Sequence, residues 1–166
     1  MIETNKCLIK TKDFLNVFHS KTNIQGCSHI SHAVERLQNN MFESSEEDIN
    51  INYEDLTYCT QNTKNGVIQI VKTKGIYKGL LEIINNSISD VDHKDTIQHI
   101  IIHFTLPSSF NLMNITKAID LIHDSLHEDA DVCVCISFTN SEDINNMYQI
   151  DSFIFYSKEN RYIMNP

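Results

Sequence analysis

The stretch DVCVCISFT at residues 131–139 constrains the fold most, because it is apolar on both sides of an extended chain. One side of such a strand would carry Val132, Val134, Ile136 and Phe138, and the other Cys133 and Cys135. A strand that buries both faces needs a layer of structure against each of them. We therefore expect a sheet that is covered by helices on both sides.

The period of the apolar residues predicts the other elements. Residues 66–74, 98–105 and 149–156 alternate as strands, and residues 76–88 and 114–126 have helical spacing. We predict an α+β fold with a four-stranded mixed sheet in the order β-α-β-α-β-β, in which Ile102 and Val134 are fully buried on central strands. The two crossover helices would cover one face of the sheet, and a helix at residues 31–41 the other.

Before residue 50 we expect a helical N-terminal segment. A short strand at residues 6–10 and a helical turn at residues 13–18 precede the helix at residues 31–41. We divide the chain into this strand-and-helix segment, residues 1–49, and an α+β domain, residues 50–166.

Composition excludes several classes of function. The 166 residues carry 13 Lys+Arg against 22 Asp+Glu, a net charge of −9, which disfavours binding to nucleic acid or to an anionic membrane. No run approaches the roughly 20 apolar residues that span a bilayer, so we expect no membrane insertion. The N-terminus lacks a secretion signal and the five cysteines are odd in number, which together favour a reducing cytoplasm.

The sequence contains no recognisable cofactor, metal or catalytic motif. Its four glycines are scattered, and neither a Walker pattern nor G-x-G-x-x-G is present. The pairs His123/His127, His29/His32 and Cys133/Cys135 lack the partners that a zinc site needs. Cys135 and His103 lie in apolar strand patterns, where a buried thiol is favoured over a catalytic one. We predict no catalytic residues, no cofactor and no metal.

The segment DININYED at residues 48–55 is rich in acids and amides. Taken by itself, this segment fits a solvated helix cap, with Asn52 as N-cap and Asp55 at the third helical position. Its stretch NINYEDL at residues 50–56 also resembles the N-x-D-F-x-D-V loop that follows the central helix of the bacterial tubulin homologue FtsZ.

The resemblance to FtsZ extends over nearly the whole chain. Residues 8–18, LIKTKDFLNVF, are similar to the L-I-V-I-P-N-D-K-L-L strand and short helix that close its GTPase domain. Residues 29–42 fall where its central helix runs. Residues 100–138 are similar to a V-L-V-N-I-T…L-x-E-x-x-x-A…I…D-A-N-I-I-F-G sequence, and the β-α-β-α-β-β order matches the FtsZ C-terminal domain.

This resemblance implies a site and a partner. The FtsZ loop projects into the nucleotide pocket of the next subunit and polarises the attacking water. Asn50 and Asp55 match the loop's Asn and second acid, whereas Asn52 replaces the first acid and lacks the charge of a carboxylate. The glycine-rich G-G-G-T-G-T-G phosphate loop of the family lies upstream of everything seen in this sequence. The resemblance therefore implies a degenerate, non-enzymatic relative.

Three functions remain open at this point. A molecule with one of the two filament contacts would cap a polymer of an FtsZ-type protein, because head-to-tail growth requires both. The second possibility is a homo-oligomeric adaptor that is unrelated to cell division and uses the same fold for another purpose, since a shared fold does not fix function. A small metal- or thiol-dependent enzyme is the third, which the motifs disfavour.

Overall fold

The structure, a computed structural model, describes residues 2–20, 28–43, 45–88, 97–140 and 147–156. The elements in chain order are β1 (Glu3–Lys10), α1 (Thr11–Ser20), α2 (Ser28–Phe42), α3 (Tyr53–Thr60), β2 (Asn65–Thr73), α4 (Ile76–Ile83) with a π-helical turn (Ile84–Ile88), β3 (Ile97–Pro107), α5 (Met113–Asp124), β4 (Asp131–Thr139) and β5 (Tyr148–Tyr156). The strands and helices expected from periodicity are all present. The division of the chain at residues 49 and 50 stays a prediction.

The described strands form one mixed sheet in the order β1-β2-β5-β3-β4. β3 and β4 are parallel, and the other neighbouring pairs are antiparallel. The α+β class is thus confirmed, but the prediction of four strands is wrong, because β1 joins the sheet as a fifth. β1 pairs with β2 along its whole length, from Glu3 opposite Lys72 to Lys10 opposite Asn65.

The sequence predicted a short strand at residues 6–10 but not its place at an edge of the main sheet. Of its eight residues only Ile9 is buried and Cys7 half-buried. The exposed positions are mostly polar or charged, as is usual at an edge that must not pair with other chains. The short apolar alternation therefore marked a strand, but did not show that the strand belongs to the main sheet.

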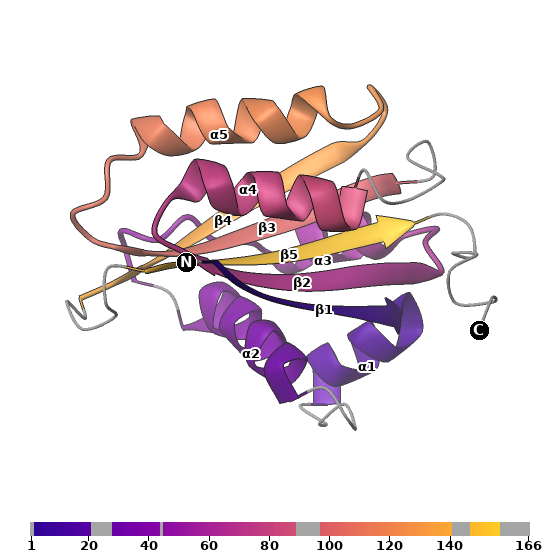
Figure 1. The fold of residues 1–166 in the computed structure, drawn as a ribbon. Helices are drawn as coiled ribbons and strands as arrows, with labels where there is room; N and C mark the ends of the chain where they lie inside the picture. The colour runs from indigo at the N-terminus through magenta and orange to yellow at the C-terminus, as the bar shows by residue number, and fades with distance from the viewer. Residues whose placement is uncertain (1, 21–27, 44, 89–96, 141–146, 157–166) are drawn as a thin grey trace.

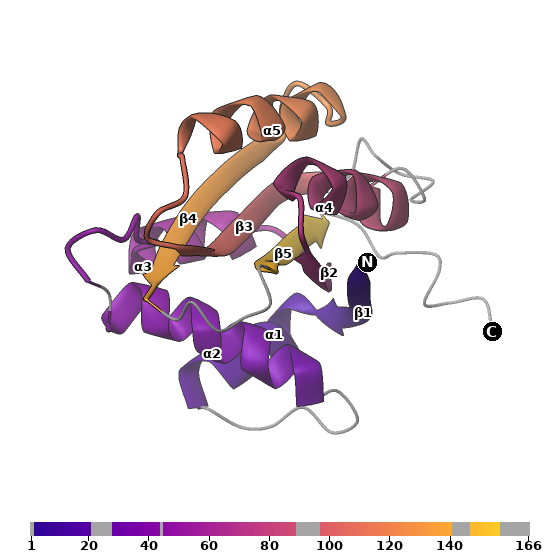
Figure 2. The same cartoon turned by 60° about the vertical axis from the view of Figure 1, so that its left-hand side comes forward.

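Helices cover both faces of the sheet, as expected. α4 and α5 lie on one face, and α1, α2 and α3 on the other (Figures 1 and 2). Alternate residues of β3 feed the two cores: Ile102 packs under α4 and α5, whereas Ile101 packs on the opposite side. Gly79 lets α4 approach closely, because a Cβ there would lie 2.7 Å from Thr73 Cγ2 and 2.7 Å from Ile150 Cδ1.

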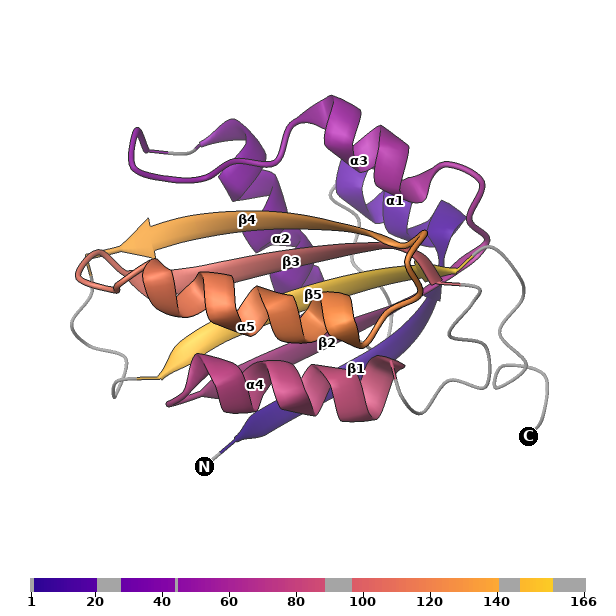
Figure 3. The ribbon, with the colours of Figure 1, turned by 90° about the horizontal axis from the view of Figure 1, so that it is seen from above.

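The position of β4 corrects one expectation about the core. Ile102 is fully buried as predicted, but Val134 is only half-buried. β4 is the other edge strand of the sheet (Figure 3), so its outer side has no strand partner to complete the burial. The apolar residues on both faces of β4 reflect helices above and below the sheet. Helices can cover both faces of an edge strand, so this pattern does not require a central place in the sheet.

Two further observations bear on the metal and membrane hypotheses. α5 ends at Asp124, so His127 lies beyond the helix that carries His123. No helix in the described ranges is long and apolar enough to cross a membrane.

Candidate interaction site

Residues 48–55 form a loop that runs along the outer edge of β4 and ends in α3; we call it the anchored loop. Ile49 and Ile136 exchange two backbone hydrogen bonds, Ile49 N to Ile136 O at 2.9 Å and Ile136 N to Ile49 O at 2.8 Å. Asp48 adds a third contact, because its Oδ1 accepts from Phe138 N at 2.9 Å. The loop thus satisfies part of the backbone that an edge strand leaves unpaired.

The C-terminal end of the anchored loop is a capping box. Asn52 Oδ1 accepts from Asp55 N at 2.8 Å, and Asp55 Oδ2 accepts from Asn52 N at 3.1 Å. This reciprocal pair occupies backbone donors that the first turn of α3 leaves without intrahelical partners. The expectation that Asn52 caps a helix with Asp55 at its third position is confirmed.

The three residues matched to the FtsZ loop lie within this one segment. Asn50 and Asn52 are exposed, and Asp55 is half-buried. Next to them, Ile51 and Leu56 are buried and fix the segment to the core. The structure thus brings Asn52 and Asp55 together through the cap.

Asn40, near the end of α2, holds the loop from inside the protein. Its side chain is 1% exposed. Asn40 Oδ1 accepts from Ile51 N at 2.9 Å, and Nδ2 donates to Ser137 Oγ at 2.9 Å. Nδ2 also lies 3.3 Å from the backbone oxygens of Ile49 and Ile136. One buried amide therefore connects α2, the anchored loop and β4.

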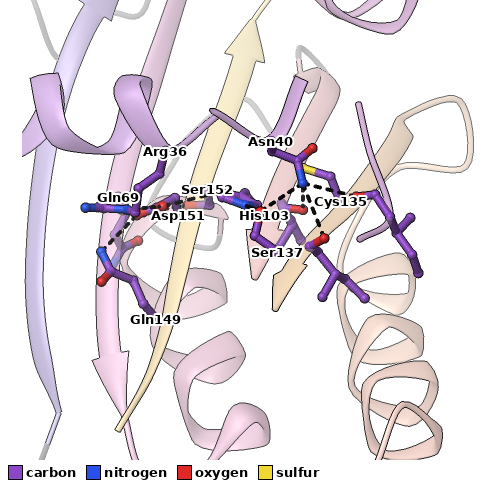
Figure 4. A network of polar contacts seen from close by, with 12 residues as sticks. Arg36, Asn40, Gln69, His103, Cys135, Ser137, Gln149, Asp151 and Ser152 are labelled. Carbon is purple, nitrogen blue, oxygen red and sulfur yellow. Dashed lines mark hydrogen bonds and ion pairs between the residues drawn. The ribbon is translucent and has the colours of Figure 1, made fainter. Parts of the chain in front are cut away.

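The contacts of Asn40 continue into a row of polar side chains across the sheet (Figure 4). Ser137 Oγ lies 2.8 Å from His103 Nε2, and His103 Nδ1 lies 3.6 Å from Asp151 Oδ2. Arg36 Nε and Nη2 donate to the two carboxylate oxygens of Asp151, both at 2.8 Å. His103 and Asp151 are directly opposite each other on β3 and β5.

The electrostatics of this row follow from burial and pairing. Burial raises the pKa of Asp151, but the hydrogen bonds and charge of its neighbours outweigh burial, so the pKa lies below its usual value. We assign the lowered pKa of Asp151 to the bidentate bond from Arg36. His103 Nδ1 is too distant from the carboxylate for a hydrogen bond, and it has no hydrogen-bond partner among the described atoms. Asp151 is therefore a buried carboxylate held by one guanidinium.

The order Asp151, His103, Ser137 has the acid, base and hydroxyl types of a catalytic triad, but its geometry favours a structural role. The carboxylate-to-imidazole distance of 3.6 Å exceeds a hydrogen bond. His103 and Asp151 are 1% and 0% exposed, which leaves a substrate no access to them. The row instead ties α2 to three strands.

The thiol and metal hypotheses gain little from the structure. Cys135 is opposite His103 on the neighbouring strand, but it is fully buried and its Sγ contacts Ile102 O at 3.7 Å. Burial raises the pKa of this thiol well above its usual value, the reverse of what activates a nucleophile. No group of three or more metal-ligating side chains comes together in the part of the chain that the structure describes.

Sequence reasoning missed Arg36, Asn40 and Asp151. A signal was available for two of them: Asp151 interrupts the apolar stretch IDSFIF, and Asn40 falls on the buried side of α2 after Ala33 and Leu37. A charge or amide at an inward position needs a partner. That partner comes from strand register and helix placement, which no local pattern contains.

Comparisons with known proteins address the fold. No protein-family model matches the sequence, and no curated protein matches it. Among solved structures, an FtsZ dimer from M. jannaschii aligns over 86% of this chain and 43% of its own, with 16% identity and a TM-score of 0.60. An FtsZ point mutant from the same organism aligns over 84% and 44%, with 19% identity and a TM-score of 0.54. At these identities the likeness establishes the fold alone: the chain has an FtsZ-like fold and spans less than half the length of the FtsZ structures it matches.

Proposed function

We propose that this chain acts in the cytoplasm as a non-enzymatic docking partner of an FtsZ-type protein, and that the anchored loop binds the nucleotide-bearing face of a neighbouring subunit. The observation that carries the proposal is the way the loop is held. Asn40 and the Ile49–Ile136 pair fix one end, and the capping box fixes the other. A loop that is ordered before binding loses little conformational entropy on docking.

The surface around the anchored loop suits a protein partner. Ile49 and Tyr53 are 45% and 55% exposed and are chain neighbours of the exposed polar residues Asn50 and Asn52. Phe42, at the end of α2, is 68% exposed. Aromatic and apolar side chains are enriched at the centre of protein interfaces, and polar side chains surround them at the rim. A docked copy that offers no second contact would end a filament, because each added subunit needs a complementary face.

Hydrolysis at such an interface should be slow. Asn52 has an amide where the FtsZ loop has an acid, and an amide neither supplies negative charge nor accepts the proton of the attacking water. The 166 residues contain no glycine-rich phosphate loop, so we expect the chain alone not to bind GTP. Equilibrium dialysis with labelled GTP measures this directly, and micromolar binding would contradict the proposal.

The main test uses the FtsZ-type protein of the same organism, with light scattering for polymer mass and phosphate release for turnover. Excess chain should lower both signals. Tyr53→Ser should weaken the effect, whereas Tyr77→Ser should not, because Tyr77 is equally exposed at 55% but lies on α4, across the sheet. Asn52→Asp should leave docking unchanged and raise phosphate release, since Asp caps a helix as well as Asn does.

Asp55→Lys, a natural choice for charge reversal on an exposed loop, is a poor probe. Asp55 is half-buried and forms one half of the capping box, so its loss destabilises α3 by about 1 kcal/mol.

The wild-type chain decides the docking proposal. Polymer mass and phosphate release that stay unchanged at every ratio of wild-type chain to FtsZ-type protein would reject it.

The alternative is a homo-oligomeric adaptor. β1 is an edge strand with an exposed Leu8, and Ile2, just before the strand, is exposed as well. Edge strands pair readily with a second copy. Lys6 and Lys10 on the same strand oppose such pairing. A concentration-dependent mass by light scattering, together with no effect on the FtsZ-type polymer, would favour the adaptor over docking.

A further inference from the structure

A polar hollow lies between α2 and the strands β1, β2 and β5. Its volume is about 120 Å³. A single water molecule needs roughly 10 to 15 Å³ of such space, so the hollow has room for an ion of several atoms. Seven of the eight described residues that line it are polar or charged, and the eighth is Ile70. The hollow is therefore suited to a small polar ligand rather than to an apolar one.

The strands form one wall of the hollow. Glu3, Lys72 and Gln149 are directly opposite one another on β1, β2 and β5. In the next row on the same face, Asn5 is opposite Ile70. Ile70 is buried and belongs to the apolar cluster beneath α1, α2 and α3. Strand register thus places an ammonium, a carboxylate and two amides around one apolar side chain.

The helix α2 forms the facing wall. His29, His32 and Arg36 are three and four residues apart, so they share one side of the helix. The bidentate bond to Asp151 fixes the Arg36 guanidinium (Figure 4), and the Gln149 side-chain oxygen lies 3.2 Å from Arg36 Nη1 when the amide is oriented to accept. Arg36 is therefore a fixed positive charge that Asp151 balances, and the hollow's free donors must come from other residues.

Those free donors are two imidazoles and an ammonium. His29, His32 and Lys72 are exposed, and none of their side chains has a hydrogen bond or ion pair to another described residue. Glu3 is opposite Lys72 in the register but forms no ion pair with it among the described atoms. An imidazole donates one N–H when neutral and two when protonated, and an ammonium donates three. Donors without protein partners thus converge on one hollow, in a chain whose net charge is −9.

We propose that this hollow binds a phosphate-sized oxyanion, with Lys72, His29 and His32 as donors and Arg36 as a fixed positive wall. Oxyanions bind where N–H donors and positive charge converge, and a concave surface strengthens the field that they meet. The volume is far below the roughly 300 to 1,000 Å³ of pockets for larger organic ligands, so a whole nucleotide does not fit. We expect an affinity on the order of millimolar, because exposed charges interact weakly.

The experiment titrates the isotope-labelled full chain with inorganic phosphate at an ionic strength held constant with chloride, and follows amide shifts by two-dimensional NMR. We expect saturable shifts at the residues that line the hollow. Lys72→Gln, and His29→Gln combined with His32→Gln, should each weaken binding roughly two- to fivefold. Glu3→Gln should strengthen binding by a similar factor, because it removes the carboxylate beside the anion. Lys78→Gln is the control, since Lys78 is equally an exposed lysine but lies on α4, across the sheet.

A parallel titration with phosphoserine identifies the source of the oxyanion. Tighter binding of phosphoserine assigns the hollow to a phosphomonoester, and tighter binding of inorganic phosphate assigns it to the free ion. Shifts that do not saturate would overturn the proposal, as would equal losses in Lys72→Gln and Lys78→Gln or a Glu3→Gln chain that binds no better than wild type. No polymer enters this test, so its result is separate from that of the docking proposal.

Discussion

Replacement of Asn40 by Ala tests whether one buried amide anchors the loop. The change removes the two shortest bonds of the side chain, to Ser137 Oγ and from Ile51 N, both at 2.9 Å. Each such bond contributes about 1 kcal/mol, and a buried N–H without a partner costs a further 1 to 3 kcal/mol. The longer contacts to the Ile49 and Ile136 oxygens, at 3.3 Å, add little.

We expect Asn40→Ala to lower the free energy of unfolding by about 3 kcal/mol, even though Ala favours the helix by roughly 0.6 kcal/mol. For a domain of this size that corresponds to a fall in Tm of roughly 6 to 12 °C. Asn39→Ala is the matched control, because Asn39 is the preceding residue of α2 and is exposed. It gains the same helix propensity and loses no described side-chain bond.

Thermal unfolding followed by circular dichroism measures the difference, and hydrogen exchange locates it. The amides of Ile51 and Ile136 should exchange faster in Asn40→Ala, while amides in α4 keep their protection relative to global unfolding. Equal melting temperatures for the two alanine variants, or unchanged protection of Ile51, would refute the anchoring role.

Two further predictions concern the buried pair and the core. Arg36→Gln leaves the Asp151 carboxylate buried without its guanidinium, which should cost roughly 3 to 5 kcal/mol near pH 7. In the wild type the pKa of Asp151 is lowered, so the pair stabilises the fold above the usual carboxyl pKa of about 3.9 and is lost as the pH falls through the folded value. The deficit of Arg36→Gln in urea unfolding should therefore shrink as the pH falls below about 4, and a pH-independent deficit would contradict the assignment. Ile102→Ala should cost about 2 to 5 kcal/mol, and Val134→Ala clearly less because Val134 is half-buried at an edge; an equal loss of Tm in the two variants would contradict this account of β4.

The local sequence pattern predicted the helices and strands well, because the period of each is visible in consecutive residues. The strand at residues 98–105 shows this: Ile100, Ile102 and Phe104 do face one core, and Ile101 and His103 the other. Pattern failed where pairing decides the outcome. That β1 joins β2, and that β4 lies at an edge, depend on contacts between distant segments.

The candidate site was likewise predictable only in part. The cap formed by Asn52 and Asp55 was predictable, since both partners are three residues apart in the sequence. The anchoring of the loop was not, because Asn40 and Ile136 reach it from α2 and β4. A loop that appears exposed and independent in sequence is in fact part of the sheet edge, and substitutions in it need to be chosen accordingly.

The buried polar row has a consequence for how the sheet finds its register. β3 and β5 bury apolar side chains on both faces, so burial alone distinguishes poorly between neighbouring pairings of the two strands. Asp151 removes this ambiguity. Only with His103 opposite it does the Asp151 carboxylate stand on the α2 side of the sheet within reach of Arg36. A slip by one residue would turn the charge into the core under α4 and α5, where burial without a partner costs several kcal/mol. We infer that the ion pair fixes the register of β5. Through His103, Ser137 and Asn40, that register sets where the anchored loop sits on β4.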